Sequence, residues 1–245
     1  MAASMQEKID KLQKMIDESH RIVFFGGAGV STESGIPDFR STDGLYNQKY
    51  DYPPETILSH SFFISNCEEF YRFYRDKMLY LDAKPNAAHI KLAELEREGR
   101  LSAVVTQNID GLHQAAGSKN VLELHGSVLR NYCCKCGKSF DISAVINSEG
   151  IPLCDECGGV IKPDVVLYEE ALDDDVVNKA VRAISSCDML IIGGTSLSVY
   201  PAAGLIRYFR GKNLVVINMS ATTAADYADL VISEGIGKVM DKIKV

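Results

Sequence analysis

Two pairs of cysteines in the sequence have the spacing of a metal site. Cys133 and Cys136 form one C-x-x-C pair, Cys154 and Cys157 form a second, and 17 residues lie between the pairs. Four thiolates in this pattern suit a tetrahedral Zn²⁺ ion, with Zn–S bonds of about 2.3 Å. A redox dithiol would explain only one pair, and Cys134 is a poorer chelator in this spacing than Cys133. Because four thiolates fill the coordination shell, we predict a structural zinc that performs no chemistry.

A second motif begins like a phosphate-binding loop. Gly27 and Gly29 match the first two glycines of the dinucleotide fingerprint G-x-G-x-x-G, but Thr32 stands where the third belongs. The acidic residue that follows about 20 positions later in redox enzymes is also missing. The loop continues instead into Pro-Asp-Phe-Arg (37–40), which an ordinary Rossmann turn does not need. The segment therefore predicts a nucleotide site that differs from that of a dehydrogenase.

Polar side chains stand at the ends of several apolar stretches, where open α/β sheets bind their ligands. They are Gln107, Asn108, Asp110, His125, Thr195 and Ser196. Taken singly, these signals are weak. A helix N-cap would explain the Asn and Asp side chains equally well, and a lone histidine is more often structural than catalytic.

We interpret the remaining histidines and two further cysteines as structural side chains. A free cysteine that binds no metal commonly behaves as a small buried hydrophobe. These structural residues are His20, His60, His89, His113, Cys67 and Cys187.

The elements that must position these residues are predicted by short apolar runs alternating with helical patterns. Buried strands are expected at 21–27, 101–107, 164–170, 188–195 and 213–220. Helices are expected at 85–99, at 173–185 and near the N-terminus, where Ile9, Leu12 and Ile16 recur at helical spacing. Strands separated by helices indicate a doubly wound parallel, Rossmann-like sheet covered on both faces.

Two segments interrupt this alternation and predict a smaller inserted lobe. Residues 45–82 are rich in aromatic side chains and are expected to form a helical insertion, and residues 127–163 hold the four predicted zinc ligands and are expected to form a zinc-binding insertion. The Rossmann-like domain then consists of 1–44, 83–126 and 164–245.

Charge and composition restrict the class of partner. The net charge of −7 argues against a general nucleic-acid binder, which would carry a basic face. The charged N-terminal stretch lacks the apolar core of a signal peptide, and no apolar run approaches the roughly 20 residues of a membrane span. We expect a cytoplasmic protein, whose cysteines are thiols or metal ligands.

Taken together and in this order, the motifs resemble those of the sirtuin family of NAD-dependent protein-lysine deacylases. The resemblance spans about residues 20–240 and depends most on "GAGVSTESGIPDFR" and "TQNIDGLH", and the compact chain is similar to bacterial or archaeal members. It implies deacetylation of lysine with NAD as co-substrate, giving nicotinamide, O-acetyl-ADP-ribose and free lysine. Three alternatives are a protein ADP-ribosyltransferase, a zinc-ribbon interaction module with an inactive nucleotide site, and a dehydrogenase.

The resemblance also implies a role for individual residues. His125 would be the general base, and Asn108 would order the ribose hydroxyls and a water together with Gln107. The residues implied to bind NAD are Ala28, Thr32, Phe39, Arg40, Gln107, Asn108, Ile109, Asp110, His125, Thr195, Ser196, Asn218 and Ile236. Phe39 would cover the reacting ribose, and Ile109 and Asp110 would line the nicotinamide pocket.

The implied partners are acetyl-lysine proteins or peptides, with no nucleic acid and no membrane. The peptide would add as a strand between two segments, represented by Val166 and Tyr168 on one side and by Val199 on the other. Many relatives have Phe-Gly-Glu where this chain has Tyr168-Glu169-Glu170, which leads us to expect a preference for basic residues in the peptide.

The helical insertion bears on which acyl group is removed. Sirtuins that remove succinyl or malonyl groups resemble one another in a Tyr-x-x-Arg pair, which can clamp a distal carboxylate. Here Tyr71 is followed three positions later by Tyr74, and Arg75 comes one position further on. We expect core tyrosines, solvated arginines and an acyl channel that prefers acetyl to succinyl.

Overall fold

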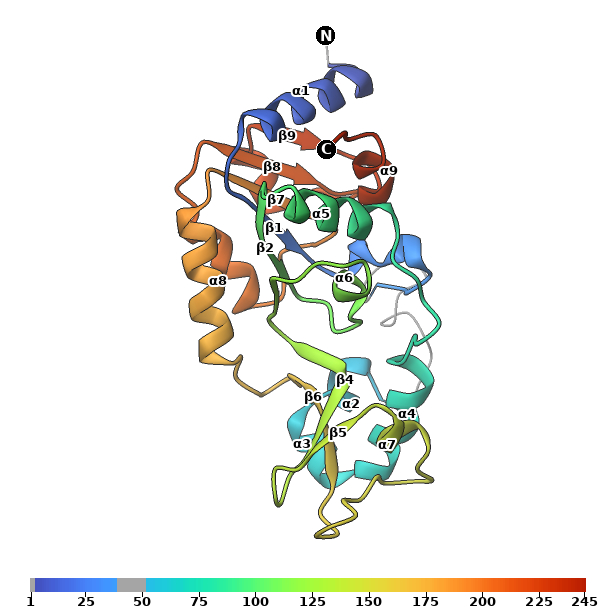
Figure 1. The fold of residues 1–245 in the computed structure, drawn as a ribbon. Helices are drawn as coiled ribbons and strands as arrows, with labels where there is room; N and C mark the ends of the chain where they lie inside the picture. The colour runs from blue at the N-terminus through green and yellow to red at the C-terminus, as the bar shows by residue number, and fades with distance from the viewer. Residues whose placement is uncertain (1–2, 39–51) are drawn as a thin grey trace.

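The computed structural model describes residues 3–38 and 52–245, which form a larger and a smaller lobe (Figure 1). The larger lobe contains a six-stranded sheet in the order β3-β2-β1-β7-β8-β9, in which every neighbouring pair is parallel. Its strands are β1 (Ile22–Gly26), β2 (Leu101–Thr106), β3 (Val121–Glu123), β7 (Met189–Gly193), β8 (Asn213–Ile217) and β9 (Leu230–Ile232). The predicted doubly wound parallel sheet is confirmed.

Helices cover both faces of this sheet. One layer consists of α1 (Met5–Glu18), α5 (Ala87–Arg97) and α9 (Ile236–Met240), and the other of α8 (Asp174–Ser186) and η4 (Ala202–Tyr208). Phe24 packs against the first layer and the next residue, Phe25, against the second, and both are fully buried. The two buried faces explain why the strand sequences are apolar at nearly every position.

The predicted helices are confirmed, and local sequence signals set where they begin. The side chain of Asp173 accepts a hydrogen bond from the N–H of Val176 at 2.9 Å, which caps α8. Ser4 and Glu7 form a capping box at the start of α1, which satisfies backbone donors that the first turn leaves free. Among residues 3–38 and 52–245, no helix has the length and apolar character needed to cross a membrane.

One predicted strand belongs to a different sheet. The stretch 164–170 was expected in the parallel sheet, but β6 covers Ile161–Val165 and pairs antiparallel with β4 (Gly126–Cys133). With β5 (Ser139–Asp141) these strands form a three-stranded sheet in the smaller lobe. The expectation was wrong because an apolar run such as Val165-Val166-Leu167 does not specify its partner strand. Strand β9, which the sequence analysis did not predict, completes the parallel sheet.

The smaller lobe joins the helical and the cysteine-bearing segments in one core. Its helices are α2 (Pro54–Ile57), α3 (His60–Ser65), α4 (Cys67–Lys77) and α7 (Ser143–Ile146). Phe63, Phe70 and Tyr71 of this core stack edge to face, and they pack with Val128 of β4 and Val165 of β6. The aromatic residues of 52–82 therefore hold the helices against the small sheet. The exact lobe boundaries at 44, 82, 126 and 163 stay predictions.

Candidate active site

Three neighbouring strands end at one edge of the parallel sheet, and their loops come together there. Gly26 at the end of β1 is in register with Thr106 of β2 and with Gly193 of β7. The N–H of Gly29 donates to the carbonyl of Gly194 at 2.8 Å, and a Cβ on Gly29 would lie 2.9 Å from the Gly194 backbone. The second glycine of the motif is therefore required by the contact between the two loops.

The polar side chains predicted at this edge form two hydrogen-bonded groups that start from the adjacent residues Gln107 and Asn108. Thr195 Oγ1 donates to Gln107 Oε1 at 3.0 Å, and Asn108 Nδ2 donates to Ser31 Oγ at 3.0 Å. Ser31 in turn donates to Asp110 Oδ2 at 2.6 Å. The structure thus brings Gln107, Asn108, Asp110 and Thr195 together. The sequence reasoning missed Ser31, although it lies within the "GAGVSTESG" motif.

The side-chain amide of Gln107 has an unused hydrogen-bond donor. Its Nε2 is buried and has no hydrogen-bond partner among the described residues. Burying an unpaired amide donor is unfavourable, so a bound polar group would relieve this cost. A Cβ on Gly27 would lie 2.8 Å from Gln107 Oε1, so the first glycine leaves room for this side chain. These features fit a polar ligand such as the ribose of NAD at the loop.

His125 is oriented by the same residue. Its Nδ1–H donates to the backbone carbonyl of Gln107 at 2.9 Å, so the neutral ring carries its lone pair on Nε2. Burial lowers the pKa of His125, and the hydrogen bond to Gln107 counteracts part of this effect. The carbonyl of His125 accepts from the N–H of Val166 at 3.0 Å. The residue therefore links the sheet edge to the predicted peptide-binding segment.

The predicted adenosine-side residues occupy different environments. Asn218 follows β8, and its Nδ2 donates to the carbonyl of Ser220 at 2.8 Å. Ile236 is only 2% exposed and belongs to the core of the larger lobe. Ser196 is exposed and shares a hydrogen bond with Ser198.

The remaining loop residues are placed by the glycine motif or fall outside the described residues. Ala28 begins the 3-10 turn η1 (Ala28–Val30), and Thr32 Oγ1 donates to the carbonyl of Gly29 at 3.0 Å. Ile109 is partly buried and packs against the core of the smaller lobe. Phe39 and Arg40 lie outside the described residues.

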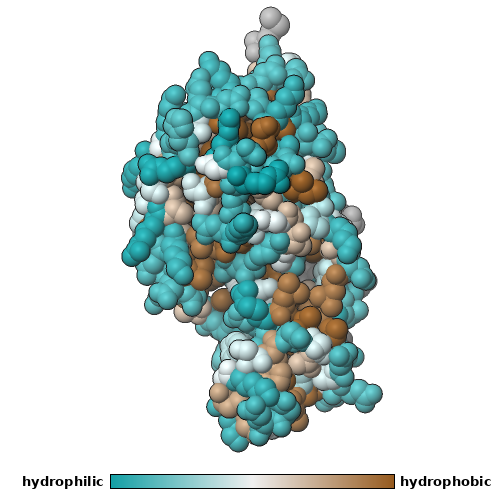
Figure 2. All heavy atoms as spheres, viewed as in Figure 1, coloured by the Kyte–Doolittle hydropathy of each residue, from teal (hydrophilic) through white to brown (hydrophobic). Residues whose placement is uncertain are grey.

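The predicted peptide-binding residues Val166 and Tyr168 follow β6, and Val199 follows β7. Apolar side chains gather near the junction of the two lobes on one face of the molecule (Figure 2). Tyr168 is held through its backbone: its N–H donates to the carbonyl of Leu58 at 2.9 Å, and its carbonyl accepts from the N–H of His60 at 3.0 Å. Val166 and Val199 are half-buried.

The four predicted cysteines form a cluster that fits a tetrahedral metal. The sulfurs of Cys133, Cys136, Cys154 and Cys157 all lie within 4.8 Å of one another. Two of the Sγ–Sγ distances are 3.4 Å and 3.7 Å, close to the edge of about 3.8 Å that Zn–S bonds of about 2.3 Å require. Cys134 is not part of the cluster. The residues therefore fit a structural zinc.

Comparison with known proteins also indicates the Sir2 family, with similarity along nearly the whole chain. A model of the Sir2 family matches residues 27–201. The chain is 64% identical to an NAD-dependent protein deacetylase of Clostridium acetobutylicum, covering 97% of this chain and 98% of the relative. A protein of the same description from Cutibacterium acnes is 52% identical, with 96% and 97% covered.

Solved structures agree in fold. A Sir2 enzyme with a deacetylated p53 peptide and 3′-O-acetyl ADP ribose has a TM-score of 0.88 and 40% identity, with 96% of each chain covered. A Sir2 structure with a p53 peptide and NAD⁺ has a TM-score of 0.84 at 40% identity, with 95% of each chain covered.

Proposed function

The chain belongs to the Sir2 family and is an NAD-dependent protein-lysine deacetylase, and we propose that His125 and Asn108 are its catalytic residues. NAD supplies the ribose carbon to which the acetyl oxygen of the lysine binds as nicotinamide leaves, and the acetyl group ends on ADP-ribose. The protein must hold the ribose beside the acetyl-lysine and accept a proton from a ribose hydroxyl.

The observation that carries this proposal is the hydrogen bond between His125 and Gln107. Because Nδ1 of His125 donates to the Gln107 carbonyl, Nε2 is the atom that can accept the hydroxyl proton. The lowered pKa keeps the ring in its neutral, proton-accepting form. Asn108 is oriented by Ser31, which fits a role in ordering the ribose or a water.

The other predicted cofactor residues are proposed in the roles that the resemblance implies. Phe39 and Arg40 remain proposals for the ribose and the phosphates, and Ala28 and Thr32 lie in the loop that would approach them. Asp110 is proposed to accept from the nicotinamide amide while Ser31 fixes its second oxygen. Ile236 would contact adenine only through the small part of its surface that is exposed, because the residue is nearly buried.

The four-cysteine site is proposed to act through structure alone. A zinc bound to four thiolates has no open position, so its role is to hold the loops that join β4, β5 and β6. Loss of the metal would loosen the smaller lobe and, through Val166, the backbone next to His125.

Acetyl-lysine peptides are the partners we propose, because Sir2 structures similar to this chain hold acetylated peptides. The peptide would lie beside Val166 and Tyr168 on one side and Val199 on the other. We also propose a cytoplasmic location, since thiols stay reduced there and free to bind zinc.

The direct test is to incubate the protein with NAD and an acetylated peptide and to follow both by mass spectrometry. We expect the peptide to lose its acetyl group and ADP-ribose to gain it in equal amount. Transfer of ADP-ribose to a protein, with the peptide still acetylated, would show an ADP-ribosyltransferase instead.

A further inference from the structure

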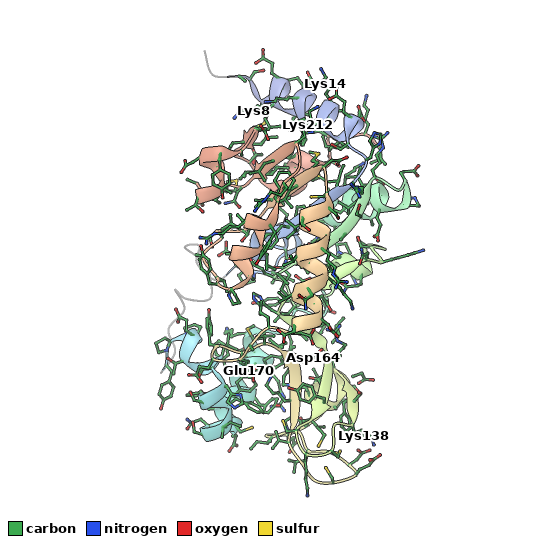
Figure 3. All side chains as sticks on the ribbon, turned by 90° about the vertical axis from the view of Figure 1, so that its left-hand side faces the viewer. Lys8, Lys14, Lys138, Asp164, Glu170 and Lys212 are labelled. Carbon is green, nitrogen blue, oxygen red and sulfur yellow. The ribbon has the colours of Figure 1, made fainter. Side chains whose placement is uncertain are left out.

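The turn after β6, residues 167–170, is fastened to helix α3 by two adjacent glutamates. Their side chains reach His60 and Ser61, the first two residues of α3. Figure 3 shows Glu170 where the smaller lobe meets the larger one, on the segment that runs from β6 toward α8. This turn includes Tyr168, one of the residues proposed to bind the peptide.

Glu169 has a backbone conformation that usually requires glycine. Its φ is +74°, in the left-handed region that is unfavourable for a residue with a Cβ. Its carboxylate accepts two hydrogen bonds from Ser61, one from the N–H at 2.9 Å and one from the hydroxyl at 3.0 Å. These bonds offset the unfavourable backbone and fix the turn against α3.

Glu170 connects three parts of the smaller lobe. One carboxylate oxygen accepts from Lys162 Nζ at 3.0 Å and from the N–H of Leu167 at 2.8 Å. The other is 2.9 Å from Nδ1 of His60. Burial acts to raise the pKa of the Glu170 carboxyl, but the bonds from Leu167, His60 and Lys162 outweigh it and lower the pKa.

Lys162 makes this connection energetically important. The residue is only 5% exposed, and its Nζ also donates to the carbonyl of Val165 at 2.9 Å. Its ammonium lies 5.8 Å from the centroid of the Tyr132 ring. A buried cation requires a paired anion, and Glu170 is the carboxylate paired with it.

We propose that Glu170, supported by Glu169, is a positioning residue that sets the shape of the peptide-binding edge and so the affinity for acetyl-lysine peptides. This inference rests on the proposed function of Val166 and Tyr168. The backbone of Leu167 is bonded to Glu170, and that of Tyr168 is bonded to Leu58 and to His60 of α3. These hydrogen bonds hold the strand edge that would be offered to a peptide.

The hydrogen bonds of Glu169 and Glu170 argue against the expected preference for peptides with basic residues. Glu169 is bonded to Ser61 through both oxygens, and Glu170 has both oxygens bonded to protein groups. The two acids are thus engaged in holding the turn, and a basic side chain of a peptide would have to compete with these partners.

The test compares Glu170→Ala with Glu170→Gln, which keeps one accepting oxygen. We measure steady-state KM for peptide and for NAD, and the Kd of the acetylated peptide by calorimetry. Glu170→Ala should raise the peptide KM and Kd about tenfold and leave the KM for NAD within about twofold. Glu170→Gln should recover most of the loss. Exposed Glu149→Ala is the matched control and should change neither constant.

A second variant separates positioning from simple charge balance. Lys162→Met combined with Glu170→Ala removes the buried cation together with its partner, so thermal stability should return close to that of the wild type. If Glu170 only neutralised Lys162, peptide affinity would return as well; we expect it to stay weakened. An unchanged peptide Kd in Glu170→Ala, or its full recovery in the double variant, would overturn the inference.

The proposed function and this inference fail differently. A wild-type protein that binds the peptide without deacetylating it would contradict the proposed function, and the Kd values would still decide the role of Glu170. A parallel rise in the KM values for NAD and for peptide would show that Glu170 supports the whole active site, which also overturns the inference.

Discussion

The imidazole of His125 is bonded to the backbone of Gln107, with Nδ1 2.9 Å from the carbonyl oxygen. The side chain of the same glutamine accepts a hydrogen bond from Thr195, which follows β7, on the other side of β1 from β2. Gln107 therefore couples the orientation of the proposed base to the geometry of the nucleotide-binding loops.

Replacing His125 by alanine should abolish most deacetylation while the fold and zinc content remain. Loss of a general base commonly reduces the rate by about 10²–10⁴-fold. The measurement is kcat/KM on an acetylated peptide, with the exposed His20→Ala as control, which should keep wild-type activity. A His125→Ala protein with more than half of the wild-type turnover would show that another group is the base.

The pH dependence of the reaction should reflect the lowered pKa of His125. Burial lowers this pKa and the hydrogen bond to Gln107 only partly restores it, so the neutral, active form persists below the ordinary value of about 6.5. We expect kcat/KM to decrease on the acid side with an inflection below about pH 6.5. An inflection above neutrality would contradict the assignment.

Cys154→Ala should lose the metal together with activity and part of the stability. Purified wild-type protein should contain one zinc per chain by elemental analysis, because the four sulfurs fit a single tetrahedral ion. The exposed Cys134, which lies outside the cluster, provides the control: Cys134→Ala should retain zinc and activity. A well-folded and fully active protein without zinc would refute the structural role.

The enzyme should prefer acetyl-lysine to succinyl-lysine. Arg75 donates to the carbonyl of Val145 at 2.8 Å and to Ser148 Oγ at 2.7 Å, so the structure corrects the expectation of a solvated arginine. Tyr71 is buried and donates to the carbonyl of Ile161, and Tyr74 is fully buried. Tyr71, Tyr74 and Arg75 are thus held by other groups of the smaller lobe. They do not form a Tyr-Arg pair that could bind the distal carboxylate of a succinyl group.

Steady-state kcat/KM on one peptide carrying either acyl group checks this preference. We expect kcat/KM to be at least about tenfold higher for the acetyl peptide than for the succinyl peptide. This is the effect expected when the succinyl carboxylate lacks one good interaction with the protein. Arg75→Ala should weaken the thermal stability and leave the ratio unchanged. A tenfold advantage for succinyl would mean that Arg75 leaves its partners to bind the substrate.

A buried pair of histidines should make the fold sensitive to acid. The rings of His89 and His113 lie 4.7 Å apart, and neither nitrogen of His113 has a hydrogen-bond partner among the described residues. Burial lowers the pKa of His113 to about 3, and His89 adds to the effect. Burial also lowers the pKa of His89, while Asp110 opposes the change.

Both rings therefore stay neutral in the folded protein, whereas the unfolded chain binds protons near pH 6.5. Their contribution to stability is complete above that pH and is lost as the pH falls toward the folded pKa, by up to about 1.4 kcal/mol per pH unit for each ring. Thermal melting at pH 7 and pH 5 should show a shallower slope for His113→Leu than for wild type. Equal slopes would contradict this account.

The sequence by itself determined the chemistry of the site and most local elements. Glycine spacing, paired cysteines and polar residues after apolar runs are local signals, and the expected strands at 21–27, 101–107, 188–195 and 213–220 all form, with slightly shorter ends. The start of a helix could also be predicted from the sequence, because a capping side chain such as Asp173 binds backbone groups only a few residues away.

Only the tertiary structure decided which strands pair and which charges meet. β6 pairs with β4 of the small antiparallel sheet, which lies about 30 residues earlier in the chain, and an apolar run does not encode that choice. Ser31 entered the site through Asn108 and Asp110, which are 77 and 79 positions away. Glu170 gained its role through His60, 110 positions earlier. Such contacts depend on how the chain folds back on itself, which local periodicity does not specify.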